Sequence, residues 1–233
     1  MYGRLPKSPK SSGTLLDKLH SFLKSEFPIS ESPRILLSGD APTQITQLSR
    51  RKGFDLIIMP THAGVFRSTL LGSTTAKLSN HADCPVMTTQ HAETISPRPI
   101  EHRECVCAIG LQADSERVLR YATQMAEAVH ANLTLVNAIP ASEPFQFDFE
   151  ERVQSAERRA ARQRIEELQR RAGSHARVSI AIGPIKDALT EAARRLQADV
   201  LVIGRSPLPG GLGRLRDLTY AVVRDAPYPV LSV

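Results

Sequence analysis

The sequence predicts an α/β fold, a doubly wound parallel sheet with helices on both faces. Two observations carry this prediction. Short apolar runs alternate with amphipathic segments along the 233 residues, which is the pattern of parallel strands joined by crossover helices. When the sequence is shifted by 144 positions, residues 39–86 align without a gap to residues 183–230. One supersecondary unit therefore occurs twice, and we predict one complete and one partial copy of the fold.

The complete copy is predicted at residues 104–233. Four amphipathic segments read as its helices, and Asp114 or Ser115 caps the first of them. Ligands of such sheets bind at the carboxyl ends of the strands, where Gly110 and the loop after Gly204 lie. The predicted strands are 105–109, 133–139, 178–182, 199–204 and 229–233, and the predicted helices are about 114–129, 150–172, 185–196 and 214–226.

The partial copy is predicted at residues 13–89, and it contains only the later elements of the unit. Nothing in this sequence corresponds to the first two strands of the complete copy or to the helix between them. We expect residues 1–12 to form a disordered basic tail and residues 90–103 to form a linker. The predicted elements are helices at about 14–27, 43–52 and 72–82, and strands at 34–38, 55–59 and 85–89.

Composition limits the class of protein. The net charge is +6, but a short basic tail is weak support for a nucleic-acid partner, and we favour a solvated tail. No apolar run approaches the ~20 residues that span a bilayer, and the first residues lack the apolar core of a signal peptide. We therefore expect a cytoplasmic protein without a membrane partner. Its three cysteines are too few for a disulfide framework, and Cys105 and Cys107 are expected to pack in the core from one strand face.

The order of these elements resembles the universal stress protein family. The segments SERVLRYA, LTLVNAI and DVLVIG, the Gly-rich loop and the final PV strand carry the resemblance in residues 104–233. In the partial copy it is carried by DLIIMPTHAGVFRSTLLGSTTAKLSNHADCPVM. The resemblance implies an adenine nucleotide alpha hydrolase-like fold with strand order 3-2-1-4-5 and tandem or dimeric assembly. It also implies a role in stress adaptation and, in one branch of the family, binding of adenine nucleotides.

The nucleotide-binding branch carries the motif G-x2-G-x9-G-[S/T] after the fourth strand. Small residues there let backbone N–H groups approach phosphate oxygens. In the partial copy, Pro60 and Ala63 replace the first two glycines, and the loop up to the intact Gly72-Ser73 is one residue short. Proline has no N–H to donate. His62 lies in this loop, and we interpret it as a loop residue instead of a catalytic one.

The complete copy departs from the same motif. Gly110 stands where that branch has the Asp that bonds adenine, and Pro207 replaces the second glycine. Arg216-Asp217 replace the closing Gly-Ser, and the Asp217 carboxylate would repel a phosphate. A second interpretation is that the loop after Gly204 binds an anion by an arrangement other than the motif. We favour the simpler interpretation, in which this loop is a flexible connection. The nucleotide or anion candidates are Gly110, Gly204, Arg205, Ser206, Gly210, Gly211, Gly213, Arg214 and Arg216 in the complete copy, and His62, Gly64, Gly72 and Ser73 in the partial one.

The predicted function is a non-catalytic, regulatory binding module of the stress response with degenerate nucleotide sites and no cofactor. No nucleophile–base pair or metal cluster stands out in the sequence. The alternative is a universal stress protein that binds ATP or AMP as a nucleotide-dependent switch. We expect the closing strands 85–89 and 229–233 to join the copies as an intramolecular pseudo-dimer, with a homodimer as the open alternative. The sequence indicates no particular protein partner.

Overall fold

The computed structural model describes residues 9–22, 24–25, 27–61, 72–89, 103–140, 147–205 and 214–233. The chain forms two compact units, residues 1–45 and 46–233. The first unit contains α1 (Pro9–Ser21) and the start of α2 (Ala41–Lys52). Helix α1 begins inside the segment predicted as a tail, because Pro9 suits the first turn of a helix, where no N–H is required. Residues 1–8 lie outside the described residues.

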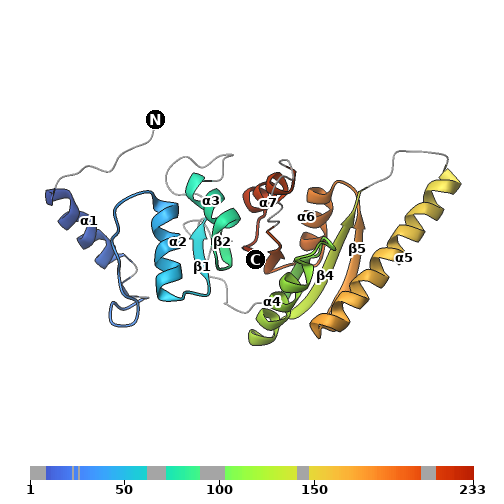
Figure 1. Ribbon diagram of the computed structural model, residues 1–233, viewed down its shortest axis with the longest axis horizontal. Helices are drawn as coiled ribbons and strands as arrows, with labels where there is room; N and C mark the ends of the chain where they lie inside the picture. The colour runs from blue at the N-terminus through green and yellow to red at the C-terminus, as the bar shows by residue number, and fades with distance from the viewer. Residues whose placement is uncertain are drawn as a thin grey trace. The chain divides into compact units, whose positions relative to one another are not determined.

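The second unit is built on a seven-stranded sheet with the order β1-β2-β7-β6-β3-β4-β5 (Figure 1). Every neighbouring pair is parallel except β2 and β7, which are antiparallel. The predicted α/β fold is confirmed, and the sheet is mixed and mostly parallel. Its strands are β1 (Ile57–Pro60), β2 (Val86–Thr89), β3 (Glu104–Ala108), β4 (Asn132–Ile139), β5 (Arg177–Ile182), β6 (Val200–Ile203) and β7 (Val230–Ser232).

Helices cover both faces of this sheet, as a doubly wound fold requires. On one face, Leu119 of α4 and Ile165 of α5 belong to the same buried cluster as Cys105. On the other face, Leu189 of α6 and Val222 of α7 belong to a second cluster. The helices of this unit beyond α2 are α3 (Ser73–His81), α4 (Ser115–Ala128), α5 (Phe147–Ala172), α6 (Ile185–Arg195) and α7 (Arg214–Asp225). Within the described residues, no helix is long and apolar enough to cross a membrane.

The alternation of β3 places its two cysteines together. Cys105 and Cys107 are fully buried on the face of α4 and α5, whereas Val106 belongs to the cluster of the opposite face. Burial raises the pKa of Cys105 to about 12 and raises the pKa of Cys107 as well. Both side chains are therefore neutral thiols at physiological pH, and the expectation that they pack in the core is confirmed.

The predicted strand at residues 34–38 is wrong, because these residues belong to no strand. Extending the offset of 144 residues places them at residues 178–182 of the complete copy, which lie in β5 and pair with β4. The sequence contains no counterpart of β4 for the partial copy, so the segment has no strand partner. Inside the first unit, the guanidinium group of Arg34 donates to the carbonyl oxygens of Phe22, Phe27 and Ser32.

The sheet continues from the partial copy into the complete one through the pairing of β2 with β7. Val86 faces Ser232, Met87 faces Leu231, and Thr88 faces Val230. Two hydroxyls add bonds across the pair: Thr88 donates to the Val230 carbonyl, and Ser232 donates to the Val86 carbonyl. The closing strands of the two copies are therefore neighbours in one sheet.

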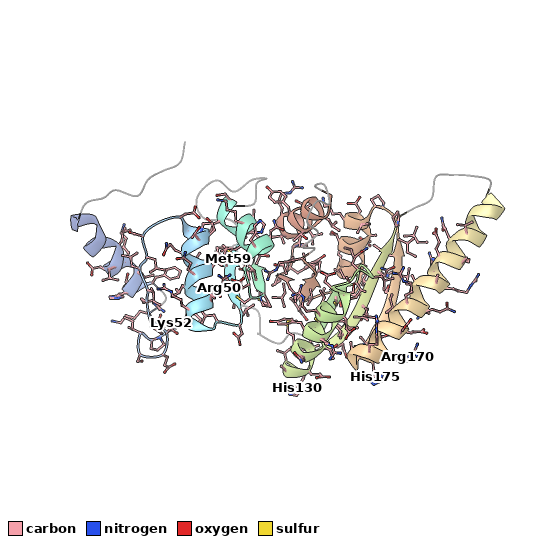
Figure 2. All side chains as sticks on the ribbon, in the orientation of Figure 1. Arg50, Lys52, Met59, His130, Arg170 and His175 are labelled. Carbon is pink, nitrogen blue, oxygen red and sulfur yellow. The ribbon has the colours of Figure 1, made fainter. Side chains whose placement is uncertain are left out.

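Polar contacts also hold the second part of α2 to the turn that precedes β2. Arg50, labelled in Figure 2, forms a two-atom ion pair with Asp83, with a shortest distance of 2.8 Å. Next to this ion pair, the Ser49 hydroxyl lies 3.1 Å from the Cys84 sulfur in a buried contact. The ion pair is exposed and contributes little by itself, whereas the Ser49–Cys84 contact is buried.

Arg205 forms the second link between the copies. It follows Gly204 after the end of β6, and its guanidinium donates to the Ser232 carbonyl at 2.8 Å and to the Cys84 carbonyl at 2.6 Å, as well as to the Ala82 carbonyl. Burial lowers the pKa of Arg205 to about 10, so the side chain stays charged at neutral pH. A single cation thus ties β7 to the turn between α3 and β2.

We predict that Arg205→Met lowers the free energy of unfolding by about 2–4 kcal/mol, because several carbonyl oxygens lose a charged donor while remaining largely buried. Urea denaturation followed by circular dichroism measures the change. The matched control is Arg194→Met, which removes an exposed arginine paired with Glu191 and should change the value by no more than about 0.5 kcal/mol. Equal losses in the two variants would contradict the role given to Arg205.

Candidate functional site

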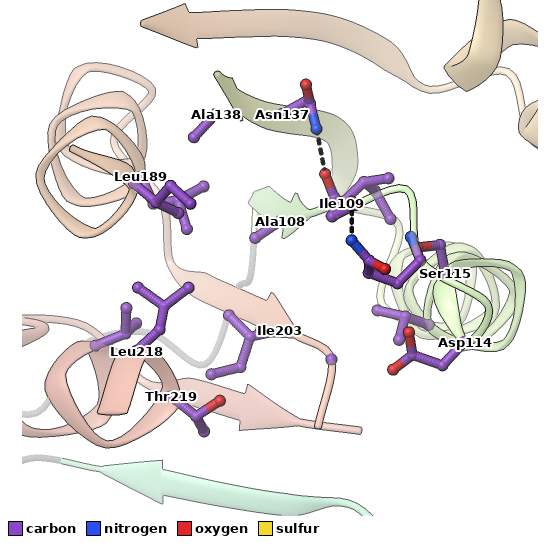
Figure 3. Close-up of a pocket in the computed structure, with 16 residues that line it drawn as sticks. Ala108, Ile109, Asp114, Ser115, Asn137, Ala138, Leu189, Ile203, Leu218 and Thr219 are labelled. Carbon is purple, nitrogen blue, oxygen red and sulfur yellow. Dashed lines mark hydrogen bonds between the residues drawn. The ribbon is translucent and has the colours of Figure 1, made fainter. Parts of the chain in front are cut away.

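A cavity of about 190 Å³ opens at the carboxyl ends of β3, β4 and β6 (Figure 3). The chain runs from β3 through β4 to β5 on one side of the sheet and from β6 to β7 on the other. The strand order therefore reverses between β3 and β6, and open α/β sheets bind their ligands at such a reversal. The cavity is smaller than the roughly 300–1,000 Å³ of pockets that hold drug-sized ligands.

Most of the cavity wall is apolar and comes from three helices and the ends of the strands. The helices α4, α6 and α7 stand around it, so that side chains from both faces of the sheet meet above the strand ends. The apolar lining residues are Ala108, Ile109, Val118, Ala138, Ile185, Leu189, Ile203, Leu218 and Val222.

Three polar donors in the wall are already bonded to the protein itself. Asn137 is buried and donates its amide N–H to the Ile109 carbonyl at 2.6 Å. The backbone N–H of Gln112 donates to the Ser115 hydroxyl at 2.8 Å, and its side-chain amide donates to the Gly110 carbonyl at 3.4 Å. These bonds hold the turn between β3 and α4 in place.

Asp114 is the charged residue among the described residues of the wall. It precedes α4, but its side chain makes no capping hydrogen bond with that helix. One of its carboxylate oxygens lies 3.2 Å from the point where a Cβ on Gly204 would be. A methyl group of Val118 lies 3.1 Å from the same point, so the carboxylate reaches the loop after β6 only because residue 204 has no side chain.

The structure brings some of the predicted candidates together at this cavity. Gly110 and Gly204 both line it. Arg205 follows directly, but its N–H groups are bonded to backbone carbonyls. Gly72 donates its N–H to the Thr61 carbonyl, and Ser73 begins α3 in the partial copy.

The remaining candidates cannot be placed against the cavity. The backbone of Arg214 and Arg216 belongs to α7, but their side chains are outside the described part of the chain. The candidates that lie outside the described residues altogether are His62, Gly64, Ser206, Gly210, Gly211 and Gly213.

Sequence reasoning missed three polar groups of the wall. The sequence predicts Asp114 only as a helix cap, and it places Asn137 in an apolar strand. The amide of Asn137 inside an apolar strand could have indicated a fixed polar group, because a buried amide needs a hydrogen-bond partner. Thr219 is the third, and the repeat pairs it with Thr75, whose hydroxyl donates to the Pro60 carbonyl. The repeated threonine was a signal that this position sits beside the end of a strand.

Comparison with known proteins identifies the family. A model of the universal stress protein family matches residues 8–90 and 101–233. The chain therefore belongs to the universal stress protein family and carries two copies of its domain. A comparison with curated proteins finds no match.

Solved structures share the fold over nearly the whole chain. A protein of Pseudomonas aeruginosa UCBPP-PA14 described as a universal stress protein is 20% identical, with a TM-score of 0.64, over 98% of this chain and 80% of its own. A universal stress protein of Archaeoglobus fulgidus is 19% identical, with a TM-score of 0.65, over 97% of this chain and 80% of its own. At these identities the likeness concerns the fold alone.

We predict that Gly204→Ala lowers the free energy of unfolding by about 1–3 kcal/mol, because the added methyl group would press on Val118 and on the Asp114 carboxylate. The matched control at the same cavity is Gly110→Ala, where the nearest atom is the Cγ of Gln112 at 3.7 Å. That variant should be unchanged or slightly stabilised, by up to about 1 kcal/mol. Urea unfolding of the two variants measures the difference in their stability. A Gly204→Ala variant as stable as Gly110→Ala would show that Val118 and Asp114 do not pack tightly against Gly204.

Proposed function

We propose that this protein is a non-catalytic regulatory module of the stress response that binds a small ligand in the cavity between β3 and β6. The observation that supports this proposal is the cavity itself, which is largely apolar and holds a few fixed polar groups at the strand reversal. We also propose that the two copies act as one pseudo-dimer within the chain, and that the protein works in the cytoplasm.

The chemistry of the wall supports a binding role over a catalytic one. General acid–base and nucleophilic catalysis need an activated nucleophile within hydrogen-bond reach of a base. The Ser115 hydroxyl accepts the bond from Gln112, and no histidine, cysteine or lysine is among the described lining residues. Within the described ranges, no three His, Cys, Asp or Glu side chains group as metal ligands.

The same wall argues against tight binding of adenine nucleotides. Gly110 offers no carboxylate at the end of β3 for an adenine amino group. At the opposite side, the Asp114 carboxylate lies beside Gly204, where the loop that cradles phosphate begins in the nucleotide-binding branch. A phosphate there would face a negative charge in a partly apolar site, which is repulsive.

The alternative is an ATP- or AMP-binding switch. The position of the cavity favours it, because the strand reversal and Gly204 are placed as a nucleotide site would place them. The two proposals differ in one measurable property, which is the affinity of the folded protein for adenine nucleotides.

We predict that ATP, ADP and AMP bind with dissociation constants no tighter than about 1 mM, which corresponds to a binding free energy of about −4 kcal/mol. We also predict that ATP is not hydrolysed. Isothermal titration calorimetry with each nucleotide measures the affinity, and phosphate release measures turnover. A micromolar constant, or ATP that stays bound through purification, would favour the switch. Reproducible hydrolysis would overturn the non-catalytic proposal.

A further inference from the structure

The geometry points to a small, positively charged ligand for the cavity between β3 and β6, an amine whose ammonium group pairs with the Asp114 carboxylate. This inference rests on the proposed function, in which the cavity is a ligand site, and it names the chemical class of the ligand. Three features of the wall carry it, and they concern charge, hydrogen-bond donors and the apolar surface.

The first feature is a carboxylate without a cation. Asp114 lines the cavity and is only partly exposed. No described Lys, Arg or His forms an ion pair with it, and it does not cap α4. The neighbouring Arg117 donates to the Val233 carbonyl. The start of α4 favours a negative charge, and among the described residues no cation pairs with the Asp114 carboxylate.

The second feature is that three N–H groups of the wall already donate within the protein. The amide of Asn137 and the two N–H donors of Gln112 are bonded to Ile109, Ser115 and Gly110, respectively. An anionic ligand would compete with the protein carbonyls and the Ser115 hydroxyl for these three N–H groups, and it would also meet the Asp114 charge. A ligand that donates hydrogen bonds meets neither obstacle, because a carboxylate accepts several of them.

The third feature is the apolar surface opposite Asp114. Leu218 and Leu189 come from α7 and α6, and Ile203 closes the floor at the end of β6. Figure 3 shows these side chains across the cavity from Asp114. A neutral apolar ligand would cover this surface but would leave a carboxylate desolvated and unpaired, which costs free energy. An amine with a compact apolar body satisfies both sides, and the volume of about 190 Å³ limits its size.

Three indole compounds of nearly equal shape test the inference. Tryptamine carries a positive charge, tryptophol is neutral, and indole-3-acetate is negative at pH 7. Because the protein has no tryptophan, the indole emission reports the ligand alone in a fluorescence titration. We expect tryptamine to bind at least about tenfold tighter than tryptophol, a difference of about 1.4 kcal/mol, and indole-3-acetate to bind most weakly.

Two variants assign the preference to Asp114. Asp114→Asn should bring the ratio of tryptamine to tryptophol affinity close to one while tryptophol still binds. The matched control is Asp187→Asn, which removes an exposed carboxylate from the first turn of α6 that does not line the cavity. The control should keep the wild-type ratio, and thermal unfolding of both variants checks that they remain folded.

The outcomes separate a failure of this inference from a failure of the proposed function. Equal affinities for the three compounds, tightest binding of indole-3-acetate, or an unchanged ratio in Asp114→Asn would overturn the inference and leave the cavity as a ligand site. If none of the three compounds binds the wild-type protein, both the inference and the proposed role of the cavity fail.

Discussion

The antiparallel pairing of β2 with β7 is the interaction that holds the partial copy in the sheet of the second unit. The partial copy supplies only β1 and β2 to the sheet, and a two-stranded pair is marginal in water by itself. Pairing with β7 places both strands at one side of a seven-stranded sheet, and Leu56 and Met87 then pack against the core that contains Leu231. Arg205 strengthens the same junction from β6 through the carbonyls of Ala82, Cys84 and Ser232.

The candidate site follows from the asymmetry between the copies. The cavity needs the ends of two adjacent strands, β3 and β4, together with β6 and the helices on both faces. The partial copy has no counterpart of β3 or β4 in this sequence, so it cannot build the same wall from its own residues. Within the second unit, the partial copy supplies the edge of the sheet, and the complete copy supplies Asp114, Asn137 and Gly204.

Most of the fold could be predicted from the sequence, because the repeat and the alternation of apolar runs with amphipathic segments are local signals. Residues 34–38 could not, since an apolar run becomes a strand only when a partner strand exists. At the site, the glycines were predictable from their spacing, whereas the uses of Arg205 and Asp114 were not. Those uses depend on distant backbone: the carbonyls of Ala82 and Cys84 for Arg205, and the close approach of Gly204 for Asp114.

Native-state hydrogen exchange tests most directly whether the two copies share one sheet. We expect protected amides of β2 to open with the same free energy as those of β3 and β6, because pairing with β7 makes all of them part of one cooperative unit. The exchange of individual amides, followed by NMR at increasing urea concentration, measures these free energies. If the amides of β2 open several kcal/mol more easily than those of β3, the join is a loose contact and the central claim is contradicted.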